Sequence, residues 1–235
     1  MNPRFDHPNV THIVKVALAL GPLVDEFVFV GGATVALFIT RPGLAPIRPT
    51  KDVDIVAAIT SQARYYEMVE KLRAHGFRQD FESELFCRLI VNAVTVDLMA
   101  TDTAILGFSN RWYQLAWDSA GRFDIADRLV SIRLISPSCF LATKCEAFFG
   151  RGDGDYLTST DIDDIVSVVA GRPEVVEEVA EAPKELRTYL REVFREWLGN
   201  RDFLEGLAGH LGPDAASQSQ IPKVRARLKS IASLP

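Results

Sequence analysis

The sequence predicts a fold of the α/β or α+β class, with a mixed-sheet lobe followed by a helical lobe. Helix and strand patterns alternate up to Ile135, as expected of a sheet covered by helices. From Ser136 onward, most segments repeat their apolar residues at helical spacing. The 235 residues suffice for one large domain or two small lobes. We therefore expect a sheet lobe over residues 1–135 and a helical lobe over 136–235, which completes an active-site cleft.

The first lobe can be divided by its periodicity and its turn residues. The run FVFV predicts a strand that ends at Gly31-Gly32, and Ser61 is placed to cap a helix that Gly76 stops. Asn92-Ala93 separates two β-rich runs and predicts a tight hairpin. The expected elements are helix 10–20, strand 27–30, a helix over ATVALFI, strand 53–59, helix 61–75, the strands LFCRLIV and VTVDLM, and the strand VSIRLI.

The second lobe opens with Ser136-Pro137, a helix cap followed by a proline in the first turn. Helices are expected over residues 137–150, 160–170, 183–198 and 222–234.

Composition restricts the kinds of partner and compartment. The net charge of −5 gives no general attraction to nucleic acid or to an anionic membrane, so a polyanion must be bound by local patches or metal. The three cysteines have no CxxC spacing, which predicts free thiols in a reducing cytoplasm. The longest apolar run, Phe27–Ile39, is too short to span a bilayer. We expect a soluble cytoplasmic protein with no membrane partner.

The strand that begins at Asp52 carries two carboxylates in an otherwise apolar run. Asp52 and Asp54 are one residue apart, so their side chains point to the same face, about 7 Å apart along the strand. Asp97 ends the run VTVDLM, and a neighbouring strand could bring it beside the pair. Three carboxylates could hold Mg²⁺ ions for a phosphoryl transfer. The alternative is a strand end that simply faces solvent.

Gly31-Gly32 lies between a predicted strand and a predicted helix. Glycines at such a place let the backbone approach a ligand, and the helix start presents free N–H groups to an anion. Thr34 could add a hydroxyl. The alternative is a turn with no ligand.

Lys144 projects from the middle of the apolar arc of its predicted helix, where a lysine could not reach water easily. Such a lysine favours an anionic ligand such as a nucleoside triphosphate, or a pairing with a core carboxylate. Asp161 lies on the apolar arc of the following helix and Asp164 at its edge. The helix dipole, which favours acidic residues in a first turn, is the alternative explanation for both.

The order of these motifs resembles the nucleotidyltransferase fold shared by polymerase-β-like enzymes. With KCEAFFGRG and TDIDDI added, the chain is similar to the AbiEii/AbiGii family of nucleotidyltransferase toxins, found in abortive-infection and type IV toxin–antitoxin systems. That family carries a G[GS] turn, a DxD, a helix resembling KxxAxxxR and a DxxD. The matching residues here are Gly31-Gly32, Asp52/Asp54, Lys144–Ala147–Arg151 and Asp161/Asp164.

The resemblance implies a role for each matched residue. Asp52 and Asp54 would hold Mg²⁺, with Asp97 as a third acidic ligand or a base, and Asp161 would orient the catalytic centre. The residues expected to bind the nucleotide and its phosphates are Gly31, Gly32, Thr34, Arg48, Lys144, Arg151 and Asp164.

The expected function is Mg²⁺-dependent transfer of a nucleoside monophosphate from an NTP. By resemblance, the acceptor would be RNA, with a tRNA 3′ end favoured, and the protein would act as a toxin with a cognate antitoxin. An aminoglycoside-like small molecule or a partner protein is an alternative acceptor. A third hypothesis is a nucleotide-binding or partner-binding module that no longer catalyses.

Overall fold

Seven strands of the described residues form one mixed sheet in the order β3-β4-β5-β2-β1-β7-β6. The computed structural model describes residues 6–41, 43, 47–102, 104–107, 110–125, 130–151 and 154–235. At the centre of the sheet, β2 pairs parallel with β5 and antiparallel with β1. The strands are β1 (Val28–Val30), β2 (Asp52–Ala57), β3 (Arg78–Gln79), β4 (Arg88–Val91), β5 (Val94–Ala100), β6 (Gly121–Ile125) and β7 (Val130–Leu134).

The chain divides into two units, which confirms the predicted class of a mixed sheet accompanied by a helical part. The sheet unit comprises Met1–Leu37 and Pro49–Ser136. The helical unit comprises Phe38–Arg48 and Pro137–Pro235. The segment Phe38–Arg48 therefore belongs with the helices, although it lies between two strands of the sheet in the sequence.

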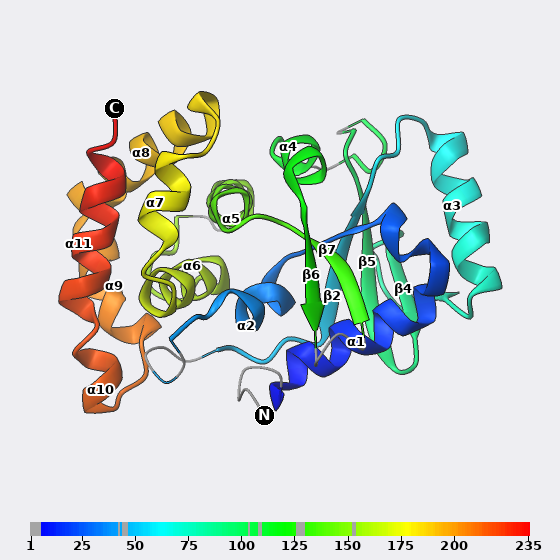
Figure 1. The fold of residues 1–235 in the computed structure, drawn as a ribbon, viewed down its shortest axis with the longest axis horizontal. Helices are drawn as coiled ribbons and strands as arrows, with labels where there is room; N and C mark the ends of the chain where they lie inside the picture. The colour runs from blue at the N-terminus through cyan, green and yellow to red at the C-terminus, as the bar shows by residue number, and fades with distance from the viewer. Residues whose placement is uncertain are drawn as a thin grey trace. The chain divides into compact units, whose positions relative to one another are not determined.

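Helix α1 (Pro8–Leu20) covers part of the sheet and contacts β2, β5 and β7 (Figure 1). Its buried residues Val10, Ile13, Val16 and Leu20 recur at helical spacing, which is why this segment forms an amphipathic helix. Helix α3 (Gln62–Ala74) begins after Ser61, whose hydroxyl oxygen accepts the Arg64 N–H at 3.2 Å. The predicted cap at Ser61 is thereby confirmed.

Short helical segments complete the sheet unit. They are η2 (Gly21–Glu26), η3 (Gly32–Thr34) and α4 (Tyr113–Ser119), while α2 (Val35–Phe38) ends at the first residue of the helical unit. The helix expected over ATVALFI is thus divided between η3 and the single turn of α2.

Asn92 and Ala93 form a two-residue turn between β4 and β5, as predicted. Both have positive φ, +49° and +60°, as expected for a hairpin turn whose twist matches that of its strands. The turn sets the register, because Val91 pairs with Val94 and Arg88 pairs with Asp97. The turn therefore determines which side chains of β4 meet the acidic end of β5.

The helical unit is built around α5 (Pro137–Arg151), which contacts α6 (Thr160–Gly171), α7 (Val175–Ala180) and α8 (Lys184–Gly199). Helix α11 (Ile221–Ala232), red in Figure 1, packs on α6, α7 and α8. The remaining helices are α9 (Arg201–His210) and α10 (Ala215–Gln218). Among the described residues, no helix has the length and apolar character needed to cross a bilayer.

The segment Phe38–Arg48 is tied to the end of α6 by backbone hydrogen bonds. The N–H groups of Thr40 and Arg41 donate to the Gly171 carbonyl at 3.0 and 2.9 Å. The guanidinium group of Arg172 also donates, through Nη1, to the Phe38 carbonyl at 2.9 Å. A β-carbon at Gly171 would lie 2.6 Å from the Ile39 side chain, so any larger residue would force Ile39 to move.

His210 at the end of α9 is buried and contacts two acceptors. Its Nδ1 lies 2.6 Å from Asp163 Oδ1, and its Nε2 lies 2.8 Å from the Tyr156 carbonyl. Because a carboxylate and a carbonyl only accept, both contacts are hydrogen bonds only when both ring nitrogens carry a proton, so this geometry favours the imidazolium cation. Burial lowers the pKa of His210, but the hydrogen bonds to Asp163 and Tyr156 outweigh burial and raise it above its ordinary value.

Replacing His210 with glutamine is expected to cost about 1.5 kcal/mol of unfolding free energy at pH 5.5, the usual scale for hydrogen bonds to a charged group. Because the folded pKa is raised, the stabilisation is fully present below the unfolded pKa and is lost as pH rises through the folded pKa. Urea denaturation of both proteins between pH 5.5 and 9 measures the difference. A difference that grows with pH would contradict the charged pairing.

Candidate active site: a carboxylate row and a buried ion cluster

Strand register gathers the three predicted carboxylates on one face of the sheet. Asp54 on β2 pairs directly with Asp97 on the parallel strand β5. Asp52 precedes Asp54 by two residues and therefore points to the same face. We call Asp52, Asp54 and Asp97 the carboxylate row. Their back neighbours Val53 and Ile55 are fully buried, so the core fixes the direction in which the row points.

Arg88 on β4 is the direct partner of Asp97 in the antiparallel hairpin. Its Nε lies 2.8 Å from Asp97 Oδ1 and its Nη2 lies 2.7 Å from Asp97 Oδ2, a bidentate pair. Nη2 also lies 3.6 Å from Asp52 Oδ2. Hydrogen bonding to Asp97 raises the pKa of Arg88. Sequence reasoning missed Arg88, although counting four pairs outward from the turn at Asn92-Ala93 would have placed it opposite Asp97.

The two ends of the carboxylate row differ in their accessibility. Asp97 is 4% exposed and both of its oxygens accept from Arg88. The Asp52 side chain is 39% exposed, and Asp54 is partly exposed. Over the described ranges, no group of three or more His, Cys, Asp or Glu side chains is arranged to hold a metal ion. The role of Asp97 as a third metal ligand stays a prediction.

The Gly31-Gly32 turn lies directly against Asp54. Val30 pairs with Asp54 across β1 and β2, and Gly31 follows with φ +71°. A β-carbon at Gly31 would lie 1.8 Å from Asp54 Oδ2. The Thr34 hydroxyl is buried and donates to the Gly31 carbonyl at 2.7 Å, while the Thr34 N–H donates to it at 3.1 Å. Thr34 therefore uses its hydroxyl proton to hold the turn.

Replacing Gly31 with alanine is expected to lower the free energy of unfolding by at least about 2 kcal/mol. The new side chain would occupy the left-handed region and overlap the Asp54 carboxylate, so both strain and displacement contribute. Chemical denaturation measures the loss, with Gly121→Ala as the control because its β-carbon meets nothing within 4 Å. Equal stability of the two variants would contradict the close contact.

In the helical unit, Lys144 on α5 lies between two carboxylates of α6. Its Nζ is 3.0 Å from Asp161 Oδ1 and 2.6 Å from Asp164 Oδ2. Arg48 Nη2 lies 3.5 Å from the same oxygen of Asp164. We call Lys144, Asp161, Asp164 and Arg48 the ion cluster. The inward direction of Lys144 is confirmed, since the residue is 7% exposed.

The ion cluster supports the alternative in which Lys144 pairs with core carboxylates. Burial lowers the pKa of Lys144, but Asp164 and Asp161 outweigh that effect and raise it above its ordinary value. Asp161 and Asp164 are only 3% and 2% exposed. Their contacts with Lys144, in addition to any helix-dipole effect, explain why these two carboxylates can be buried. Arg151 ends α5, and its side chain lies outside the described residues.

No protein-family model and no curated protein sequence matches this chain. Several solved structures match it, among them the following three. The antibiotic-resistance factor ANT(2'')-Ia has 15% identity and a TM-score of 0.44, over 79% of this chain and 92% of that chain. JHP933 from Helicobacter pylori has 11% identity and a TM-score of 0.46, over 99% and 93%. A candidate nucleotidyltransferase from H. pylori has 11% identity and a TM-score of 0.47, over 99% and 96%. Likenesses at this level assign neither a family nor a substrate to this chain.

Proposed function

We propose that this protein is a Mg²⁺-dependent nucleotidyltransferase that transfers a nucleoside monophosphate from an NTP and releases pyrophosphate. The observation that carries this proposal is the carboxylate row. Asp54 on β2 has Asp97 of β5 on one side and the Gly31 turn, which follows β1, on the other. Grouped carboxylates facing away from an apolar core suit a site that must bind a cation.

The carboxylates present suit a Mg²⁺ ion that is coordinated partly by the protein and partly by the substrate. Mg²⁺ is usually held by one or two carboxylates together with substrate phosphates, and Asp52 and Asp54 are the accessible pair. When bound, the metal would neutralise charge on the phosphates and on the leaving oxygen. Asp97 would act mainly by holding Arg88 in place. The Nη2 atom of Arg88 then lies 3.6 Å from Asp52 Oδ2.

The neighbouring residues have positioning roles in this proposal. Gly31 lacks a side chain where the Asp54 carboxylate lies, so the turn leaves that carboxylate room to occupy its position. A contact between the Gly31 backbone and a phosphate stays a prediction. Thr34 fixes the turn by its two hydrogen bonds to the Gly31 carbonyl. Arg88 keeps the carboxylates of β2 and β5 in place by pairing with Asp97 and Asp52. Such catalysis would rest on orientation and on charge stabilisation.

We also propose that the ion cluster serves the triphosphate, as the resemblance implies. Lys144 has three N–H donors and directs two of them at Asp161 and Asp164. Asp161 would hold the lysine in position, and Arg48 would provide a second cation through its contact with Asp164. The triphosphate contact expected of Arg151 stays a prediction.

The proposed acceptor is RNA, with a tRNA 3′ end favoured, and the proposed context is a toxin controlled by an antitoxin. These two points rest on the resemblance of the motifs. Incubation with each NTP labelled at the α-phosphate, together with total tRNA, an aminoglycoside or cell extract, tests them. We expect label on tRNA. Label on the aminoglycoside or on a protein would overturn the RNA acceptor, and NTP binding without transfer to any acceptor would overturn the enzyme assignment.

A further inference from the structure

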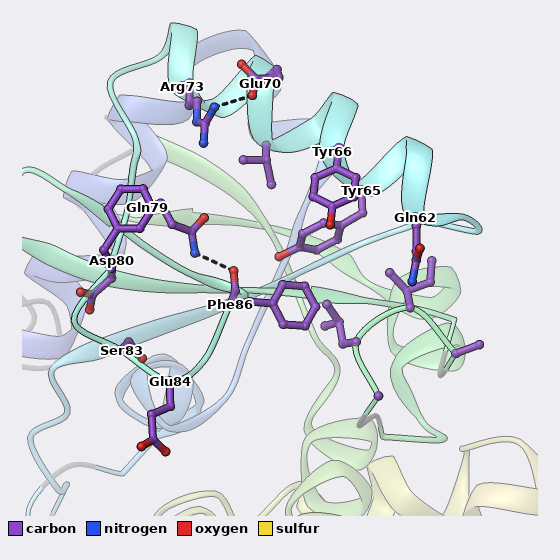
Figure 2. Close-up of a pocket in the computed structure, with 16 residues that line it drawn as sticks. Gln62, Tyr65, Tyr66, Glu70, Arg73, Gln79, Asp80, Ser83, Glu84 and Phe86 are labelled. Carbon is purple, nitrogen blue, oxygen red and sulfur yellow. Dashed lines mark hydrogen bonds and ion pairs between the residues drawn. The ribbon is translucent and has the colours of Figure 1, made fainter.

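A pocket of about 790 Å³ lies in the sheet unit, between α3 and the segment that leads into β4 (Figure 2). Residues 104–107, which follow β5, line its remaining side. None of the described lining residues belongs to the carboxylate row or to the ion cluster. The proposed nucleotidyl transfer therefore leaves this pocket without a role.

Tyr65 brings an unsatisfied hydroxyl to this pocket. The residue is 2% exposed, and its hydroxyl has no hydrogen-bond partner within the described part of the chain. In Figure 2 the hydroxyl points away from α3, toward the space beside Gln79 and Phe86. Burial raises the pKa of Tyr65, so the hydroxyl stays a hydrogen-bond donor at neutral pH. A buried donor without a partner is costly, and a ligand acceptor atom would remove that cost.

Aromatic side chains form much of the apolar lining. The ring centroids of Phe86 and Tyr65 are 5.6 Å apart, and those of Tyr66 and Tyr65 are 6.1 Å apart. Tyr66, Phe81 and Phe86 remain 64%, 88% and 46% exposed. Large aromatic surfaces around a pocket favour a ligand with a ring, and their faces also attract cations.

The charges of the lining favour a cation over an anion. Glu70 and Arg73 pair with each other at 2.5 Å. Asp80 and Glu84 also line the pocket, and neither forms an ion pair with another described residue. Two uncompensated carboxylates beside exposed aromatic rings would repel a phosphate and attract an amine.

We propose that this pocket binds an organic amine that carries an aromatic ring and a hydrogen-bond acceptor. The ring packs against the exposed faces of Tyr66 and Phe86, the ammonium group faces Asp80 and Glu84, and the acceptor takes the Tyr65 hydroxyl. The site is separate from the proposed nucleotide chemistry, so it stands or falls independently of it.

Isothermal titration calorimetry with a charge-matched pair of probes tests the proposal. We expect 5-methoxytryptamine to bind at one site, and 5-methoxyindole-3-acetic acid, which has the same ring but the opposite charge, to bind at least about tenfold more weakly. Glu84→Gln should weaken amine binding several-fold. Glu67→Gln, on the exposed side of α3 and outside the pocket, should leave it unchanged. No saturable amine binding, or equal binding of the two probes, would overturn the proposal.

Tyr65→Phe separates the hydroxyl from the packing of the ring. The variant should bind the amine about fivefold more weakly, the effect of one hydrogen bond. Its melting temperature should not fall, because the hydroxyl has no partner among the described residues. Unchanged affinity, or a clear loss of stability, would show that the hydroxyl serves another purpose. A concentration-dependent dimer in sedimentation that Phe81→Ser abolishes would assign the pocket to a second copy and also overturn the proposal.

Discussion

Replacing Lys144 with methionine is expected to lower the free energy of unfolding by about 3–5 kcal/mol, the usual loss when one partner of a buried ion pair is removed. Methionine keeps much of the volume but leaves Asp161 and Asp164 as neighbouring buried carboxylates. Arg48 lies 3.5 Å from Asp164, farther than Lys144 does, so it is a weaker partner for that carboxylate. Urea denaturation of the variant and of wild type measures the loss.

Two further variants decide whether the effect comes from charge. Lys184→Met, at an exposed position at the start of α8, should leave stability within about 0.5 kcal/mol of wild type. Lys144→Met combined with Asp161→Asn and Asp164→Asn also removes the two buried negative charges that paired with Lys144, and should recover much of the loss. Wild-type stability of the single Lys144→Met variant would contradict the ion cluster.

Replacing Asp54 with asparagine is expected to reduce nucleotidyl transfer by at least about 100-fold, the scale for losing one key electrostatic contact in an active site. Stability should be unchanged or higher, because the substitution removes one of three neighbouring negative charges on this face of the sheet, where Arg88 pairs with the other two, Asp52 and Asp97. Opposite effects on activity and stability are typical of residues kept for function.

Transfer rates and melting temperatures of Asp54→Asn should be measured beside those of Asp118→Asn. Asp118 is an exposed carboxylate on α4 that contacts Gln114 and lies outside the carboxylate row. We expect wild-type activity from the control. If Asp54→Asn were as active as the control, the row could not be the catalytic centre.

Much of the sheet unit was predictable because its signals are local. The apolar back of β2 and the alternation at Asp52 and Asp54 fix which way those side chains point. The two-residue turn at Asn92-Ala93 fixes the partners along β4 and β5. Short-range rules of this kind carry over directly from sequence to structure.

Other features depend on contacts between residues that are distant in the sequence. The direction of Lys144 followed from helical periodicity, but its partners depend on how α5 packs against α6. The assignment of Phe38–Arg48 to the helical unit depends on hydrogen bonds to Gly171. The unsatisfied hydroxyl of Tyr65 had no sequence signal, since a tyrosine on the buried side of an amphipathic helix is ordinary.

Transfer from NTPs labelled at either the α- or the γ-phosphate tests the central claim most directly. With Mg²⁺ and total tRNA, wild type should place the α label on the acceptor and release the γ label as pyrophosphate. Asp54→Asn should do neither at a comparable rate. Transfer of the γ label to the acceptor, or equal α-label transfer by Asp54→Asn, would contradict a nucleotidyltransferase centred on the carboxylate row.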